Sequence, residues 1–192
     1  MITKEQVLPF IHLAFAEDVR DGDHSSLACI PQEKVGRAHL LVKDQGIIAG
    51  IQLAKWIFDS IDPTLKVSTL LNDGDTVKKG DIAFIVEGCS VSILTAERLV
   101  LNCMQRMSAI ATKTKEYVAL VEGTNTTILD TRKTTPGIRI LEKWAVRIGG
   151  GANHRFGLYD MIMLKDNHLD YAGGITLAIE KTLSYLKEKN LD

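Results

Sequence analysis

The chain has 192 residues, of which 45% are hydrophobic and 24% are charged, and its formal net charge is −1. This length is enough for one sizeable core or two small domains, and the composition is that of an ordinary globular protein. So small a net charge argues against general binding to nucleic acid or to a membrane surface. An anionic ligand would have to be recognised by a local group of basic residues.

The sequence predicts a cytoplasmic protein. Cys29, Cys89 and Cys103 are widely spaced and odd in number, which is typical of reduced thiols. The first residues lack a basic stretch followed by an apolar one, so we expect no signal peptide. No apolar run approaches the roughly 18–20 residues of a membrane span.

The first hundred residues predict a small layered domain. Thr3 and Gln6 have the spacing of a capping box, and apolar residues at helical spacing follow to about Asp18. The next patterns predict a strand, a helix and two antiparallel strands at residues 38–42, 53–58, 66–71 and 82–86. This order predicts an α+β sandwich.

The pattern changes near Thr95, which we expect to cap a helix that runs to about Gly123 with a break near Ser108. Strand and helix then alternate, at residues 127–129, 138–148, 161–164 and 175–187. Alternation of this kind indicates parallel strands and predicts the first part of an α/β barrel. We place the domain boundary inside the long helix, with a sandwich domain at 1–105 and a partial barrel domain at 106–192.

A complete barrel of this type needs roughly 250 residues. Only two of its strands are expected here, and such a remnant would leave an open strand edge. We therefore expect the chain to be the front part of a longer protein.

Three stretches with basic side chains are the most informative feature of the sequence. They lie at residues 130–137, 149–155 and 165–168, and two of them follow predicted strands. Residues just past a strand of an α/β barrel face the mouth of the active site. We expect four basic residues to converge there on an anion with several carboxylates or phosphates: Arg132, Lys133, Arg155 and Lys165.

Each stretch also has a plainer interpretation. The basic pair at 132–133 could be a solvated loop, but the neighbouring threonines and a helix start at 136–137 favour an anion site. The glycines at 149–151 either end a helix loosely or let the backbone approach a ligand. His154 is favoured as a site residue, whereas His168 is interpreted as a structural cap.

Covalent and metal-dependent chemistry find little support in the motifs. The five histidines lack the spacing of metal ligands, and no glycine-rich nucleotide loop or nucleophile elbow occurs. The residues predict an electrostatic site without a protein nucleophile.

Residues 130–168 resemble the signature region of the quinolinate phosphoribosyltransferases; they read DTRKTTPGIRILEKWAVRIGGGANHRFGLYDMIMLKDNH. Residues 94–112 resemble the interdomain helix of that family, and 17–23 its amino-terminal motif. The resemblance implies a sandwich domain joined to an incomplete barrel. It also implies transfer of phosphoribosyl from phosphoribosyl diphosphate to quinolinate with decarboxylation, a step of NAD biosynthesis.

The resemblance also implies roles for individual residues. Arg132, Arg155 and Lys165 would bind the two carboxylates of quinolinate, with His154 beside them. Lys133 and Lys165 are the expected catalytic residues.

Further residues and partners follow from the same resemblance. Thr131 and Lys133 would border the substrates, with Lys133 nearer to phosphoribosyl diphosphate. Arg98 would enter the site of a neighbouring subunit, since family members are homodimers or higher homo-oligomers. Mg²⁺ would accompany phosphoribosyl diphosphate, but the resemblance places its acidic ligands beyond residue 192. We therefore expect no metal ligand here and doubtful activity of these residues alone.

Three alternatives remain open on the sequence. Residues 72–81 resemble the turn of biotinyl and lipoyl carrier domains, although no lysine follows at the position of the modified one. A related pyrophosphorylase-like protein would keep the fold and take another substrate. The third alternative is a non-catalytic binding or scaffold fragment, which would have no enzymatic activity.

Overall fold

The computed structural model describes residues 2–191, which form two compact units. The first unit ends at His154 and the second begins at Arg155. The elements of the first unit are α1 (Lys4–Asp18), α2 (His24–Cys29), β1 (Val35–Leu41), β2 (Gly46–Ile47), α3 (Ile51–Ile61), β3 (Lys66–Thr69), β4 (Thr76–Val77), β5 (Ile82–Cys89), α4 (Ser90–Leu120) and α5 (Arg139–Ile148). The second unit contains α6 (Asp166–Ala172) and α7 (Ile175–Lys189).

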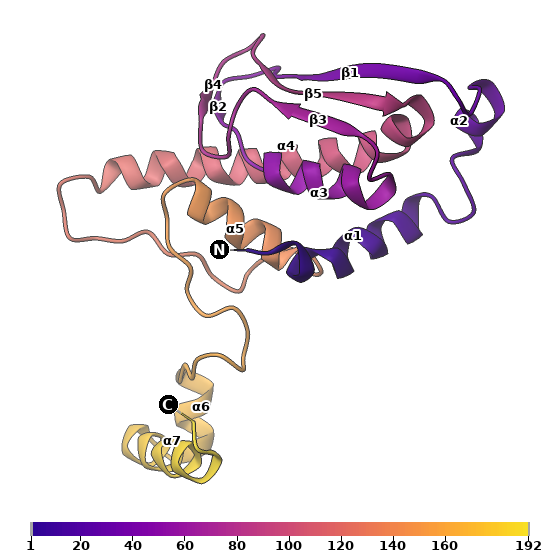
Figure 1. The fold of residues 1–192 in the computed structure, drawn as a ribbon. Coiled ribbons are helices and arrows are strands. Elements are labelled where there is room, and N and C mark those ends of the chain that lie inside the picture. The colour runs from indigo at the N-terminus through magenta and orange to yellow at the C-terminus, as the bar shows by residue number, and fades with distance from the viewer. Residues whose placement is uncertain (1, 192) are drawn as a thin grey trace. The chain divides into compact units, whose positions relative to one another are not determined.

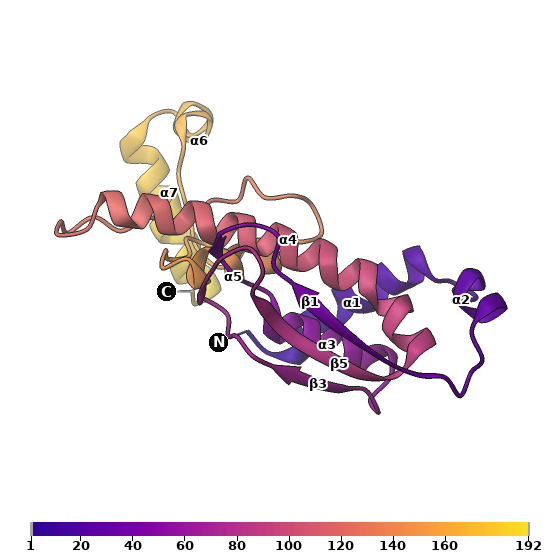
Figure 2. The same ribbon diagram turned by 90° about the horizontal axis from the view of Figure 1, so that it is seen from above.

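The first unit is a layer of strands on a layer of helices. β1, β5 and β3 form an antiparallel sheet in that order, and β2 pairs with β4 beside it. Val86 of the central strand lies opposite Ala38 on one side and Val67 on the other. α3 and α4 cover the same face of this sheet (Figures 1 and 2). The α+β arrangement predicted for the first hundred residues is therefore present.

The core lies between the sheet and the helices. Val7 and Ile11 of α1 are fully buried, as are Leu53 and Ile57 of α3. Their spacing of four residues places each pair on one helical face, which is the pattern that predicted both helices. The predicted start of α1 is also correct, since the backbone N–H of Thr3 donates to Gln6 Oε1 at 3.0 Å.

The long helix differs from its prediction in two ways. α4 begins at Ser90, so Thr95 does not cap it; the Thr95 hydroxyl instead donates to the carbonyl of Val91 at 2.8 Å. The helix also continues without a break at Ser108. The hydroxyl of Ser108 accepts from the backbone N–H of Ala49 at 2.9 Å. Polar side chains that suggested a break are used to bind a neighbouring backbone.

Among the described residues after α4, parallel pairing is limited to one bridge between Leu129 and Ala152. The backbone N–H of Asp130 donates to the Ala152 carbonyl at 3.1 Å, and that of Ala152 to the Ile128 carbonyl at 2.9 Å. The predicted strand at 161–164 is wrong, because these residues form no ladder with any described residue. A β-strand needs such a partner, and an apolar run alone does not supply one.

The predicted domain boundary after residue 105 falls inside α4, whereas the compact units divide between His154 and Arg155. Packing therefore marks a different position along the chain, and the boundary stays a prediction. No helix within residues 2–191 combines the length and the hydropathy that a membrane crossing requires.

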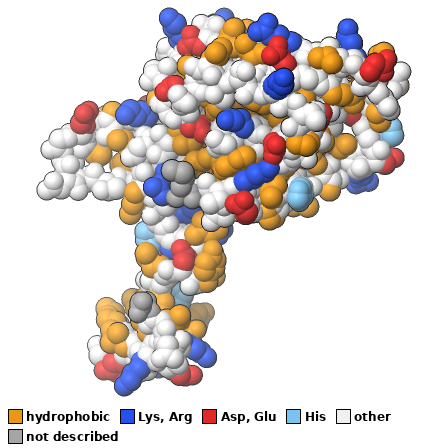
Figure 3. All heavy atoms as spheres, viewed as in Figure 1, with side chains coloured by type: hydrophobic (Ala, Val, Ile, Leu, Met, Phe, Trp, Pro, Cys, Tyr) orange, Lys and Arg blue, Asp and Glu red, His pale blue; other side chains and the backbone are white. Residues whose placement is uncertain are grey.

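The surface agrees with the small net charge. On the face drawn in Figure 3, basic and acidic side chains are interspersed over the sheet and helices of the first unit. No large area of that face carries charges of one sign. An anion that binds on this face would be recognised by particular residues and not by a broad field.

Candidate functional site

The first residue of the basic segment, defined as residues 130–135, forms a buried ion pair with α5. The Asp130 carboxylate pairs with Nζ of Lys143, and these side chains are 5% and 3% exposed. The same carboxylate accepts from the backbone N–H of His154 at 2.9 Å and from the side-chain amide of Asn153. Lys143 Nζ also donates to the His154 carbonyl at 3.0 Å. These bonds satisfy the buried charges and join α5 to both the segment and the glycine loop, defined as residues 149–154.

The last residue of the basic segment, Thr135, is bound by Glu142, which precedes Lys143 on α5. The backbone N–H of Thr135 donates to Glu142 Oε2 at 3.1 Å. Arg106 of α4 donates from Nε and Nη2 to Glu142 Oε1 at 2.9 and 2.7 Å. Burial raises the pKa of the Glu142 carboxyl, but the bonds from Arg106 and Thr135 lower it by more, so the pKa lies below its ordinary value. Glu142 is therefore ionised at neutral pH.

Between these two contacts the basic segment forms a turn. The backbone N–H of Lys133 donates to Thr131 Oγ1 at 3.0 Å, and Nε of Arg139 donates to Thr134 Oγ1 at 2.9 Å. Nε of Arg132 is buried and has no hydrogen-bond partner within residues 2–191. A buried guanidinium N–H without an acceptor is costly, and a bound anion would supply that acceptor.

The glycines before Asn153 pack against α4. A Cβ at Gly149 would lie 2.4 Å from the carbonyl oxygen of Ala111, and one at Gly151 would lie 2.9 Å from Thr114 Cγ2. Gly150 has a φ of 92°, which favours glycine. These contacts explain the three glycines by the end of α5 and its packing, which is the plainer of the two interpretations of this stretch.

The structure brings together four of the predicted site residues: Thr131, Arg132, Lys133 and His154. Thr131, Arg132 and Lys133 follow Asp130 in the turn, which the bond from the Lys133 N–H to Thr131 Oγ1 closes. The backbone N–H of His154 donates to the Asp130 carboxylate. His154 contributes only backbone atoms to this network, so its imidazole is not used there. Arg98 is exposed on α4, and no hydrogen bond or ion pair joins it to the basic segment among the described residues.

The remaining predicted residues belong to the second unit. Arg155 is 7% exposed, and its Nη1 donates to the Met161 carbonyl at 3.0 Å. Lys165 is exposed and precedes α6, where its backbone N–H donates to Nδ1 of His168 at 3.0 Å. The interpretation of His168 as a cap is confirmed. The convergence of Arg155 and Lys165 with the residues of the first unit stays a prediction.

Three residues that organise the site were not predicted: Arg106, Glu142 and Lys143. The signal for them was weak but present. Glu142 and Lys143 lie between Leu141 and Ala145 on α5, and all four are buried. Charged residues among buried apolar ones are uncommon unless they are paired. Their partners are 13 and 36 residues away, so the pairing itself could not be found from local sequence.

The residues present do not fit a metal ion. No group of three His, Cys, Asp or Glu side chains with metal-binding geometry occurs in the described part of the chain. The two carboxylates beside the basic segment, Asp130 and Glu142, are each paired with a basic side chain. A carboxylate that neutralises a cation in this way is a poor ligand for Mg²⁺.

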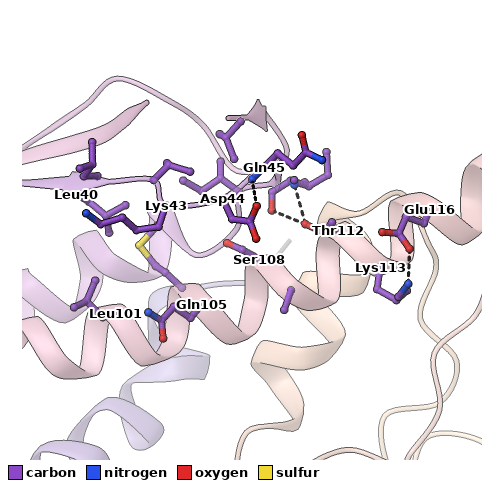
Figure 4. Close-up of a pocket in the computed structure, with 18 residues that line it drawn as sticks. Leu40, Lys43, Asp44, Gln45, Leu101, Gln105, Ser108, Thr112, Lys113 and Glu116 are labelled. Atoms are coloured by element: carbon purple, nitrogen blue, oxygen red, sulfur yellow. Dashed lines mark hydrogen bonds and ion pairs between the residues drawn. The ribbon is translucent and has the colours of Figure 1, made fainter. Parts of the chain in front are cut away.

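A cavity of about 500 Å³ lies elsewhere in the first unit, between α4 and the chain that follows β1 (Figure 4). Its polar lining includes Gln45 and Gln105, and none of the predicted site residues line it. The hydroxyls of Ser108 and Thr112 in its wall bind the backbone of neighbouring residues. The cavity is separate from the basic segment.

Comparison with known proteins gives matches over almost the whole chain. The model of the quinolinate phosphoribosyl transferase N-terminal domain matches residues 23–108, and that of the C-terminal domain matches residues 110–191. The chain is 51% identical over 183 residues to a protein of Nicotiana tabacum named quinolinate phosphoribosyltransferase (decarboxylating) 1b. This match covers 94% of the chain but 51% of the tobacco protein, so the chain spans about half the length of that relative.

Two solved structures have the same fold. NadC from Streptococcus pyogenes matches with a TM-score of 0.90 and 37% identity, over 96% of this chain and 66% of that one. The nicotinate-nucleotide pyrophosphorylase from Ehrlichia chaffeensis matches with a TM-score of 0.87 and 35% identity, over 97% and 67% of the two chains. The C-terminal domain model includes residues 130–168, and both structures cover almost the whole chain, so they agree with the resemblance carried by that stretch. The chain belongs to the quinolinate phosphoribosyltransferase family.

Proposed function

We propose that this protein transfers a phosphoribosyl group from phosphoribosyl diphosphate to quinolinate, with decarboxylation. The products are nicotinate mononucleotide, diphosphate and CO₂, which is a step of NAD biosynthesis. The observation that supports this most strongly is the 51% identity to a tobacco protein named for the activity.

Quinolinate carries two carboxylates, and we assign Arg132, Arg155 and Lys165 to them, with His154 beside these residues. The buried, unpartnered Nε of Arg132 supports this assignment, because a carboxylate would accept its hydrogen. A guanidinium also presents two parallel donors to a carboxylate, which lysine cannot do.

The reaction needs no protein nucleophile. The ring nitrogen of quinolinate attacks C1 of the ribose, and the C1–O bond breaks with its electron pair leaving on diphosphate. The bond from C2 to its carboxylate then breaks and CO₂ leaves. The electron pair left on C2 is stabilised by the adjacent pyridinium nitrogen and takes up a proton from solvent. Basic side chains orient the dianion and stabilise leaving charge, and we assign these tasks to Lys133 and Lys165, with Thr131 at the substrate border.

Mg²⁺ is the cation that we propose to accompany phosphoribosyl diphosphate. The described residues do not fit a site for it, since Asp130 and Glu142 are already paired. We derive no step through the metal ion for this reason.

Assembly and architecture complete the proposal. We propose a homodimer or higher homo-oligomer in which Arg98 serves the site of the neighbouring subunit; its exposure on α4 is compatible with that role. We also propose that residues after α4 belong to an incomplete α/β barrel, which the parallel bridge between Leu129 and Ala152 supports. The cytoplasmic location stays a prediction.

The experiment is calorimetric titration of the protein with quinolinate, with nicotinate as the comparison ligand because it lacks the 2-carboxylate. We expect Arg132→Lys to weaken quinolinate binding tenfold or more. A desolvated charge-assisted pair costs about 2–5 kcal/mol to break, and about 1.4 kcal/mol is already tenfold.

Arg147→Lys is the matched control, because Arg147 is exposed on α5. It should leave quinolinate binding unchanged. Equal affinity of the unsubstituted protein for quinolinate and nicotinate would contradict the substrate assignment and favour a related protein with another substrate. Binding without formation of nicotinate mononucleotide, after addition of phosphoribosyl diphosphate and Mg²⁺, would favour a non-catalytic binding fragment.

A further inference from the structure

We infer that Glu142 and Lys143 are positioning residues that hold the two ends of the basic segment and thereby place Arg132 for an anionic substrate. The inference rests on the proposed function, since quinolinate is the substrate used to test it. Neither residue touches the substrate in this account. Each acts through the segment that it binds.

The two side chains leave α5 at consecutive positions and bind opposite ends of one short segment. Lys143 pairs with Asp130 at its start, and Glu142 accepts from the backbone N–H of Thr135 at its end. Consecutive residues of an α-helix point about 100° apart, so one helix can reach two places in this way. Arg132 lies between the two fixed points and its position is therefore set from both sides.

The two contacts also fix the elements around the segment. The Asp130 carboxylate binds the backbone N–H of His154, so Lys143 sets the position of the glycine loop together with that of the segment. Glu142 binds Arg106, and Arg106 Nη2 lies 3.4 Å from Thr135 Oγ1. Hydrogen bonds and ion pairs thus attach the segment to α4, to α5 and to the glycine loop. Substrate-binding side chains need placement within about 0.5 Å, which such supporting bonds provide.

Attachment of α5 to the protein does not depend on these charges. Leu141 and Ala145 are buried in the core of the first unit. Trp144 packs on Trp56, with ring centroids 5.6 Å apart. A buried ion pair is itself weak support for stability, because apolar residues of similar volume often replace one without loss. What the charged pair adds is a defined geometry for the segment.

The experiment measures quinolinate affinity and the state of α5 in the same samples. The variants are Lys143→Met and Glu142→Gln, compared by calorimetry and by near-ultraviolet circular dichroism. The chain has two tryptophans, Trp56 and Trp144, so this signal reports whether α5 stays in place. We expect quinolinate affinity to fall at least tenfold in each variant while the tryptophan signal is retained.

Lys113→Met is the matched control, because Lys113 forms an exposed ion pair with Glu116 outside the site. It should bind quinolinate as the unsubstituted protein does. Lys143→Arg keeps the charge and should recover part of the affinity lost in Lys143→Met. Glu142→Gln guards against misfolding, because its partner Arg106 is 54% exposed and can be solvated when the pair is broken.

The outcomes separate this inference from the proposed function. If the unsubstituted protein does not bind quinolinate, the proposed function is wrong. If it binds and both variants bind equally well, the positioning role alone is wrong. A loss of affinity that occurs only together with loss of the tryptophan signal would also overturn it, since the residues would then merely hold α5 in the fold.

Discussion

The two compact units differ in how they treat their apolar side chains. The first unit buries a continuous cluster, and several large side chains are less than 2% exposed: Val7, Ile11, Leu53, Ile57, Val86, Val100 and Met107. In the second unit, Ala178 is the one apolar side chain that is buried among the described residues. The first unit therefore has a core of its own and the second does not.

Helix α7 shows what this difference means. Ile175, Ile179 and Leu183 recur every four residues and so form one stripe, yet their exposed fractions are 64%, 47% and 62%. An isolated helix of this length is marginal in water. The apolar stripe of α7 therefore needs another surface to pack on. The apolar face of α3 is already buried inside the first unit.

The largest expected effect is a difference in the free energy of unfolding between Leu→Ala substitutions in the two units. Leu53 is fully buried and Leu183 is 62% exposed. We expect Leu53→Ala to lower the free energy of unfolding by about 2–5 kcal/mol, because it removes buried contacts and leaves a cavity. Leu183→Ala should change it by less than about 0.5 kcal/mol. Denaturant unfolding followed by circular dichroism measures both. Equal losses would show that the second unit has a core of its own.

Elements of the first unit could be predicted because their apolar periodicity is satisfied locally. The expected position of α3 lies inside the observed one, and those of α1 and α5 agree with the observed ones to about one residue at each end, since each helix has an apolar face that packs on the adjacent core. The short α2 and α6 were missed, because six or seven residues hold too little periodicity. Residues 161–164 were taken for a strand because apolar runs look alike, and only a pairing partner distinguishes them.

The site could be predicted in part. Arg132, Lys133 and His154 were singled out by their basic and imidazole side chains and by a family resemblance, and Thr131 by its hydroxyl and the same resemblance. Their roles toward a ligand stay predictions. The sequence did not show that Lys143 binds Asp130 or that Arg106 binds Glu142, because such pairs form only when α4 and α5 pack. Side chains expected to contact an anion stand out in the sequence by their positive charge. Side chains that position them can be recognised only from the residues that they bind in the folded structure.

A smaller effect is expected at the edge of the first unit, where the glycine loop meets α4. Gly149 has an ordinary φ of −73°, but a Cβ there would lie 2.4 Å from the Ala111 carbonyl oxygen. We expect Gly149→Ala to cost about 1–3 kcal/mol, as overpacking does. Gly150→Ala is the comparison, because it meets only ordinary contacts with Val118 and strains a φ of 92° by about 1–2 kcal/mol.

The discriminating measurement is a second substitution at the contact. Replacing the opposing Thr114 by Gly removes the Cβ that lies 2.7 Å from the added atom, so it should recover part of the loss in Gly149→Ala, with Thr114→Gly alone as the reference. It should recover nothing in Gly150→Ala. Thermal unfolding of these variants decides this. Equal recovery in both would mean that close packing of this loop is not the cause.

The smallest effect concerns the pH dependence of stability. Burial raises the pKa of Glu142, but the bonds from Arg106 and Thr135 lower it by more, so the folded pKa lies below the ordinary value of about 4.3. A depressed folded pKa stabilises the protein above about pH 4.3, and this contribution is lost as the pH falls from there through the folded pKa.

At pH 7 we expect Glu142→Gln to be less stable by on the order of 1 kcal/mol, because the half-exposed Arg106 can be solvated. This deficit should shrink as the pH falls below about 4.3. Glu180→Gln on the exposed surface of α7 should leave the profile unchanged at every pH. A deficit of Glu142→Gln that stays constant down to pH 3 would show that its carboxylate is not the stabilising form.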